Sequence, residues 1–258
     1  MSKRKKAVED KIKKRKRKAV FGVLLRVFLA LVIVALLAFM SIVFFFTVED
    51  VTYSGSTLYS DAQLSKMLFT DEYSTNSVYC LVKNKLFPRT GIPFVETVEV
   101  TMSDPNHLSV KITEKVFAGR MADVDGNQLY FNEDNEVTEV STAVLDGVVE
   151  VTMEDVQLSG LVKGDSLPFK SKRSKEVQNL FSDLDEQNIA VSAVHFYSDG
   201  SITMEYGTIL INLGSSTNLD AKILRLKYIL PQIEGQTGTL HLEDWSEGNR
   251  DIVFEMAE

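Results

Sequence analysis

The sequence predicts an α+β protein in which one apolar anchor helix is followed by two globular parts on the far side of a membrane. Three observations carry this prediction. An uncharged apolar segment lies near the N-terminus, a strand-helix-helix-strand-strand order follows it directly, and short strands interrupted by two amphipathic helices fill the remaining chain. A length of 258 residues is enough for one or two domains of ordinary size.

Residues 21–46 are predicted to form a transmembrane helix. From Val27 to Phe46 the chain has no charged residue and one polar residue, Ser41. Twenty residues at about 1.5 Å each make a helix of ~30 Å, which matches the hydrocarbon core of a bilayer. A cleaved signal peptide is the rival interpretation, but its apolar region runs to only about 15 residues and ends in a small-x-small site, which is missing here.

Residues 1–20 are predicted to be a basic cytoplasmic tail. The first 18 residues hold 11 of the 28 basic residues and 2 of the 36 acidic residues, so they carry +9 while the rest carries −17. Basic flanks stay in the cytoplasm and contact anionic lipid, at about 1 kcal/mol per Lys or Arg. A nucleic-acid arm is the alternative, but the acidic remainder argues against nucleic acid as a partner. With almost no apolar content, the tail is not expected to fold alone.

Residues 47–114 are predicted to form the first domain outside the membrane. Ser60 followed by Gln63 is typical of a capping box at a helix start, and alternating apolar residues on both sides of Asp104-Pro105-Asn106 indicate a hairpin. The expected elements are a strand at 48–53, helices starting near residues 60 and 77, and strands at 97–102 and 108–113. Cys80, the only cysteine, lies among apolar residues and is expected to be buried rather than reactive.

Residues 115–258 are predicted to form a second, β-rich extracytoplasmic domain. Asp-Gly pairs at 125–126 and 199–200 indicate hairpin turns. Amphipathic helices are predicted at 174–186 and 218–233. The expected strands are 117–124, 128–131, 148–151, 191–197, 201–206, 208–213, 239–242 and 252–254.

The ordered set of segments resembles a known family. "VEDVTYSGSTLYSDAQL" and "IPFVETVEVTMSDPNHLSVKITEK" are similar to the opening and the hairpin of the POTRA domain of the bacterial cell-division protein FtsQ, called DivIB in Gram-positive bacteria. "DVDGNQLYFNEDNEV" resembles the start of that family's second domain, and "ILINLGSSTNLDAKILRLKYIL" with "GTLHLED" resembles its close. The resemblance covers nearly the whole chain from Lys3 to Phe254 and identifies residues 47–114 as the POTRA domain.

The resemblance implies a non-enzymatic scaffold of the divisome. Members of the family bind the small bitopic proteins FtsL and FtsB (DivIC), help regulate septal peptidoglycan synthesis with the septal synthase complex, and are enriched at the division septum. Their late strands form the docking edge for FtsB or DivIC. The residues here that correspond to that edge, with an inserted Glu247 that departs from the family spacing, are Trp245, Ser246, Gly248, Ile252 and Phe254.

The residues themselves also favour a docking edge near the C-terminus. The last predicted strand ends close to the end of the chain, so we expect it at the edge of a sheet, where unpaired backbone groups can bind a partner strand. Trp245 is the only tryptophan, a type of residue enriched in interface hot spots. A structural role for Trp245, in the core or at a corner of the fold, is supported equally well by the sequence. For Ile252 and Phe254 we favour core packing.

No catalytic or cofactor motif is found in the sequence. Nucleophile-elbow and phosphate-loop patterns are missing, and the one Ser-x-x-Lys lies in the tail at residues 2–5. The three histidines are far apart and lack ligand spacing. Residues 123, 125, 127 and 134 match four positions of a calcium loop, but its sixth position is Gln128 instead of glycine, so a hairpin turn is the better account. We therefore expect no enzyme, no metal and no cofactor.

Three other functions are alternatives to the scaffold. A membrane-anchored cell-wall enzyme needs a nucleophile or metal site that the sequence lacks. Another POTRA-bearing protein, such as an outer-membrane assembly factor, needs a long series of barrel strands after the first domain. A protein of the FtsL or DivIC type needs sustained heptads beyond the membrane.

Overall fold

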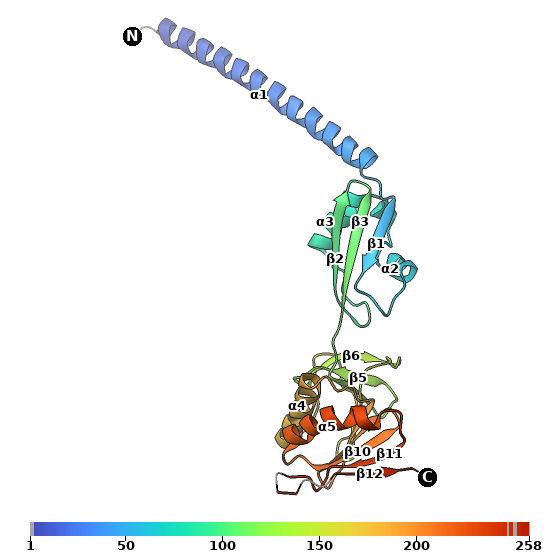
Figure 1. The fold of residues 1–258 in the computed structure, drawn as a ribbon. Helices are drawn as coiled ribbons and strands as arrows, with labels where there is room; N and C mark the ends of the chain where they lie inside the picture. Colours follow the sequence, from blue (N-terminus) through green and yellow to red (C-terminus); the bar gives the residue numbers. More distant parts are fainter. Residues whose placement is uncertain (1–2, 247, 250–251, 258) are drawn as a thin grey trace. The chain divides into compact units, whose positions relative to one another are not determined.

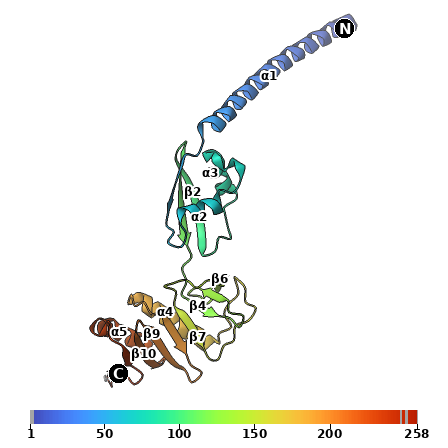
Figure 2. The same ribbon diagram turned by 90° about the vertical axis from the view of Figure 1, so that its right-hand side faces the viewer.

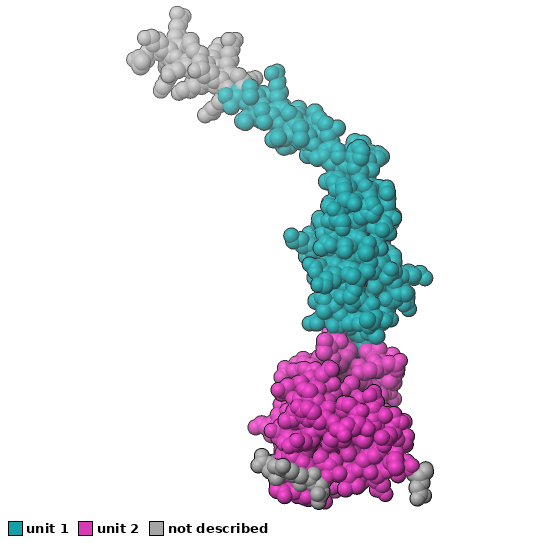
Figure 3. Space-filling view, in the orientation of Figure 1, with its two compact units in different colours: residues 1–114 teal, residues 115–258 magenta. Residues whose placement is uncertain are grey.

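The computed structural model of the chain describes residues 3–246, 248–249 and 252–257, with side chains from residue 20 onward. The prediction of an α+β protein with an N-terminal apolar helix and a large β-sheet domain is confirmed; Figures 1 and 2 show the fold from two sides. Two compact units, Met1–Glu114 and Lys115–Glu258, each have a hydrophobic core of their own (Figure 3).

Unit 1 begins with the long helix α1 (Lys3–Phe45). Its segment Val20–Phe45 has 26 residues, and none of its most apolar stretch is buried. At about 1.5 Å per residue this segment is ~39 Å long, so the described residues include one helix that is long and apolar enough to span a membrane. The basic tail was predicted not to fold alone, and the backbone of residues 3–19 continues this helix, because a helix that has been nucleated propagates at little cost.

The rest of unit 1 is a three-stranded sheet with helices packed on it. Strand β3 lies in the middle, parallel to β1 and antiparallel to β2. Leu64 and Cys80 from the helices pack with Val110 and Ile112 from the sheet. The 3-10 turn η1 lies in the polar segment between the two helices. The elements are β1 (Asp50–Ser54), α2 (Asp61–Leu68), η1 (Glu72–Thr75), α3 (Ser77–Leu86), β2 (Val95–Asp104) and β3 (His107–Glu114).

A glycine and a carboxylate hold the loop after β1. Gly55 has a φ of +82°, and a Cβ there would lie 2.2 Å from the carbonyl oxygen of Ile112, so only glycine fits. The Glu114 carboxylate accepts hydrogen bonds from the backbone N–H groups of Thr57 at 2.7 Å and Leu58 at 2.9 Å. Because β1 and β3 are parallel, the last residue of β3, Glu114, lies at the same end of the sheet as the loop after β1 and holds that loop in place.

Unit 2 is a nine-stranded mixed sheet with α4 and α5 packed on one face. The strand order is β12-β11-β10-β9-β8-β7-β4-β5-β6. Helix α4 connects the parallel pair β7 and β8, and α5 connects the parallel pair β10 and β11, as parallel neighbours require. The elements are β4 (Gly119–Ala122), β5 (Gln128–Phe131), β6 (Val137–Ser141), β7 (Glu150–Met153), α4 (Ser171–Glu186), β8 (Ala193–Phe196), β9 (Ser201–Tyr206), β10 (Ile209–Ser215), α5 (Leu219–Ile233), β11 (Gly238–His241) and β12 (Val253–Met256).

The two faces of this sheet differ in polarity. Alternate residues such as Phe196, Met204 and Ile211 are fully buried against the helices. The intervening residues lie on the opposite face and are partly or fully exposed, as the two-residue period of a strand requires. From β7 to β12 the register aligns on this opposite face Thr152, His195, Thr203, Asn212, His241 and Val253.

Candidate functional site

The last strand, β12, lies at one edge of the nine-stranded sheet, as the sequence predicts. It pairs antiparallel with β11, with Leu240 opposite Phe254 and His241 opposite Val253. The Ala257 N–H donates to the Thr237 carbonyl oxygen at 2.9 Å, so the odd-numbered residues of the strand face β11. Because antiparallel residues alternate in direction, the backbone groups of Phe254 and Met256 point to the free edge. Among the strands that the structure describes, none pairs with that edge.

The side chains at this edge are largely apolar. Val253 is 57% exposed and Met256 is 69% exposed. Ile252 and Phe254 are partly buried and pack against the core of unit 2, which is the role favoured from the sequence. The edge therefore combines unpaired backbone groups with two exposed apolar side chains, and one charged residue, Glu255, lies between them.

A glycine allows β12 to approach β11 closely. A Cβ on Gly238 would lie 2.2 Å from the carbonyl oxygen of Glu255 and 3.0 Å from the Cζ of Phe254. Any larger residue at position 238 would push β12 away. Glycine is therefore required at this position by packing alone.

The predicted site residue Trp245 is a core residue at the corner before β12. Its side chain is 5% exposed and belongs to the core of unit 2, and the Arg225 guanidinium carbon lies 5.7 Å from the ring centroid. The backbone N–H of Trp245 donates to the Leu242 carbonyl oxygen at 3.1 Å, which closes a turn. Between the core and interface roles that the sequence left open, burial favours the core, so Trp245 positions the loop that leads to the edge.

The other predicted site residues in this loop form a polar turn. The Ser246 N–H donates to the Asn249 carbonyl oxygen at 2.8 Å, and the Asn249 N–H donates to the Ser246 hydroxyl at 3.1 Å. Gly248 is exposed, and a Cβ there would meet nothing within 4 Å. The inserted Glu247 lies outside the described residues. The structure thus brings Ile252 and Phe254 to the edge itself and leaves Ser246 and Gly248 in the loop before it.

His241 on β11 contacts two carboxylates, of which only Glu255 lies on β12. Its Nδ1 lies 2.8 Å from an oxygen of Glu243, and its Nε2 lies 3.6 Å from an oxygen of Glu255 on β12. The hydrogen bond with Glu243 is the main reason that the pKa of His241 is raised, and the charges of both carboxylates raise it further. Burial raises the pKa of Glu243, but its hydrogen bonds, including the one with His241, lower it more. Because the Glu255 carboxylate on β12 contributes to this rise in pKa, protonation of His241 favours the attachment of β12 through Glu255.

A buried lysine supports the neighbouring strand. The Lys222 side chain is 1% exposed, and its Nζ donates to the carbonyl oxygens of Leu213 at 2.6 Å and Ser215 at 3.2 Å. These carbonyls flank the bulge at Gly214, so the ammonium group replaces ladder bonds that the bulge removes. Burial lowers the pKa of Lys222, against the attraction of Glu243. No local pattern predicts this role, because Lys222 has the surroundings of an ordinary residue in an amphipathic helix.

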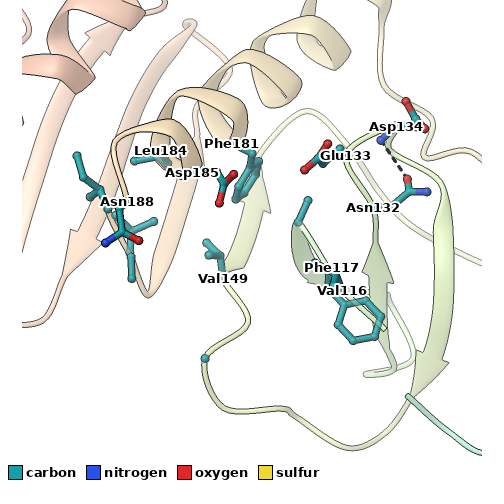
Figure 4. A pocket seen from close by; sticks show the side chains of 15 residues that line it. Val116, Phe117, Asn132, Glu133, Asp134, Val149, Phe181, Leu184, Asp185 and Asn188 are labelled. Atoms are coloured by element: carbon teal, nitrogen blue, oxygen red, sulfur yellow. Dashed lines mark hydrogen bonds between the residues drawn. The ribbon is translucent and has the colours of Figure 1, made fainter. Parts of the chain in front are cut away.

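A groove of about 490 Å³ lies elsewhere in unit 2, between the C-terminal half of α4 with the loop after it and the segments that precede β4, join β5 to β6 and precede β7. Its apolar lining includes Phe181 and Leu184, and Figure 4 shows Asp185 and Glu133 on either side of Phe181. All fifteen lining residues are described, and they include no histidine, cysteine, serine or lysine. The groove was not predicted, because its walls come from four separate parts of the chain.

The residues rejected as a calcium loop form a hairpin turn. Asp123 accepts hydrogen bonds from the N–H groups of Asp125 at 2.9 Å and Asn127 at 2.8 Å. Over the described part of the chain, no group of three His, Cys, Asp or Glu residues is placed to hold a metal ion. Cys80 is buried in unit 1, and burial raises the pKa of its thiol to about 11, as expected of a structural cysteine.

The fold and the site together define an α+β protein with one apolar helix, long enough to span a membrane, and an open sheet edge near its C-terminus. In comparisons with known proteins, no family model and no curated sequence matches this chain.

Proposed function

We propose that this chain is a non-enzymatic divisome scaffold of the FtsQ/DivIB type. Its basic tail would lie in the cytoplasm against anionic lipid, residues 47–114 would be a POTRA domain, and residues 115–258 would be the β domain outside the membrane. The observation that carries this proposal is the free edge of β12, at the place where the family resemblance puts partner docking. The order β1-α2-α3-β2-β3 in unit 1 supports the POTRA assignment.

Docking would proceed by addition of a partner segment beside β12. The N–H and C=O groups of Phe254 and Met256 offer hydrogen bonds to a strand of an FtsB- or DivIC-type protein, and the exposed Val253 and Met256 side chains offer apolar contact. Each backbone bond adds about 1 kcal/mol net. FtsL would join through the same bitopic partner, and the complex would regulate the septal synthase.

Capture of the partner by the full-length membrane protein tests this edge. Val253→Lys with Met256→Lys places two charges at exposed positions and leaves the core intact, so the protein is expected to fold and to lose the DivIC-type partner. Leu210→Lys is the matched control, because Leu210 is 40% exposed but lies on β10, two strands from the edge. Undiminished capture by the folded double variant would exclude docking at β12.

Localisation tests the wider proposal. A tagged, functional copy is expected to be enriched at the division septum in dividing cells. Uniform fluorescence over the membrane throughout the cell cycle would count against a divisome role, whatever the capture experiment gives.

A further inference from the structure

A second apolar surface lies in unit 1, next to the anchor helix. Outside α1, five large apolar side chains of the described part of this unit are exposed, and four of them lie on η1 or at α3. Tyr73 is 61%, Val82 47%, Leu86 65% and Phe87 74% exposed. We call these four residues the α3 surface. Residues 78, 82 and 86 follow one another at four-residue intervals, so they share one side of the helix.

The α3 surface is attached to the end of the anchor. The Asn76 side chain donates to the carbonyl oxygen of Ile42 at 2.9 Å, and the Ser77 N–H donates to that of Phe46 at 2.9 Å. The Phe46 carbonyl lies just past the helix end, where carbonyl groups have no partner within the helix, and the Ile42 carbonyl also accepts the Phe46 N–H at 3.3 Å. The start of α3 is thereby held against the final turn of α1.

A groove of about 470 Å³ separates the two helices. One wall is formed by Phe39, Ile42 and Val43 of the apolar span, and the other includes Tyr73 and Val82. The wall formed by α1 is part of the apolar surface of the anchor. The medium that surrounds the anchor at this level therefore also contacts Tyr73 and Val82 on the opposite wall. A ~39 Å apolar helix exceeds a ~30 Å hydrocarbon core, so these last turns lie where hydrocarbon meets headgroups.

The chemistry of the α3 surface fits that position. Tyrosine is enriched at the boundary between hydrocarbon and water, with its ring in the apolar layer and its hydroxyl outside. The exposed basic residues Lys85 and Arg89 lie beside the apolar ones, where their side chains can reach phosphate groups. A helix with apolar residues on one side and basic residues next to them is typical of helices that lie in a membrane interface.

We propose that α3 is an interfacial helix, and that lipid of the outer leaflet fills the groove between α1 and α3. Tyr73, Val82 and Leu86 then lie in the leaflet, and Lys85 and Arg89 contact its headgroups. The first domain is thus held against the membrane surface. This inference needs the anchor to span a membrane, as in the proposed function, but it does not depend on any divisome partner.

Spin-label accessibility of the full chain in vesicles of phosphatidylcholine and phosphatidylglycerol tests the proposal. Cys80→Ala removes the native thiol, and single cysteines are then introduced as Val82→Cys, Leu86→Cys, Leu31→Cys in the anchor and Thr101→Cys on the exposed side of β2. Labels at 82 and 86 are expected to lose contact with a water-soluble nickel complex and to keep contact with dissolved oxygen, as at position 31. The label at 101 is expected to stay open to nickel.

Nickel access at 82 and 86 equal to that at 101 would overturn the proposal. Loss of access to both reagents would also overturn it, because protein, such as a second copy of the chain, would then cover the groove instead of lipid. Nickel access at position 31 would show that the anchor does not span the membrane, and would contradict the membrane topology of the proposed function as well. A normal result at 31 with failure at 82 and 86 would contradict the interfacial helix alone.

Discussion

Gly238→Ala is expected to loosen β12 without unfolding unit 2. The added Cβ would lie 2.2 Å from the Glu255 carbonyl oxygen, 3.0 Å from the Met256 Cα and 3.0 Å from the Phe254 ring. Two of these three atoms belong to the backbone, so the clash cannot be relieved by turning a side chain. Strand β12 itself must move.

The size of the effect follows from the attachments of β12. Two of its four residue pairs with β11, those of Val253 and Glu255, exchange two hydrogen bonds each; at about 1 kcal/mol per net bond these four bonds contribute about 4 kcal/mol. Partial burial of the Phe254 ring adds about 1 kcal/mol. Overpacking costs about 1–3 kcal/mol, which is less than this total, so β12 stays attached on average. Its detached population should rise by roughly 5- to 150-fold.

Hydrogen exchange measures this population. The backbone amides of Val253, Glu255 and Ala257 are expected to exchange faster by about the factor given above, while those of β8 and β9 keep their rates. Gly248→Ala is the matched control, since a Cβ there meets nothing within 4 Å. Unchanged exchange in β12 of the Gly238→Ala protein would refute the steric argument, and cooperative loss of the whole sheet would refute the independent attachment of this strand.

Three further predictions concern single side chains. Glu114→Gln is expected to lower the stability of unit 1 by about 1 kcal/mol in urea unfolding, because a charged acceptor is lost. The pKa of Glu114 is lowered, because its hydrogen bonds outweigh the effect of burial. Its contribution to stability should therefore be present above pH 4.5 and disappear as the pH falls through the pKa of the folded state. A wild-type protein whose stability does not fall over this acid range would contradict the prediction. The pKa of His241 is raised, chiefly by Glu243, so the contribution of His241 should be complete below pH 6.5 and be lost as the pH rises through the folded value. As the pH rises over this range, the hydrogen exchange of β12, corrected for intrinsic rates, should become faster in the wild type and stay constant in His241→Gln. The same pH trend in His241→Gln would show that another group causes it. Trp245→Lys should unfold unit 2, as seen by circular dichroism, because it buries a charge; a folded variant would contradict the core role.

Local signals in the sequence predicted much of the fold. The apolar span is a continuous run of residues, and the Asp-Gly turn at 199–200 lies between two strands that pair with each other. The capping box at Ser60 is present in the hydrogen bond from its N–H to the Gln63 side chain. Each of these features depends on residues close together in the chain, so composition and spacing suffice to predict it.

Features that depend on distant residues were not predicted. Strand β6 was missed, because only Val137 in it is buried and its pattern does not alternate. The pairing of β4 with β7 joins segments about thirty residues apart through a single register pair, which no local pattern specifies. The role of Trp245 stayed open for a different reason: large aromatic residues serve cores and interfaces equally well, and only burial separates the two.

The unbroken course of α1 has a mechanical consequence. A continuous helix is stiff to twisting, and successive residues are rotated by about 100° around its axis. The hydrogen bonds from Asn76 and Ser77 to the end of α1 restrict rotation of this helix relative to the first domain. In the proposed membrane topology, a rotation of the first residues of α1 about the helix axis would therefore rotate the first domain by the same angle.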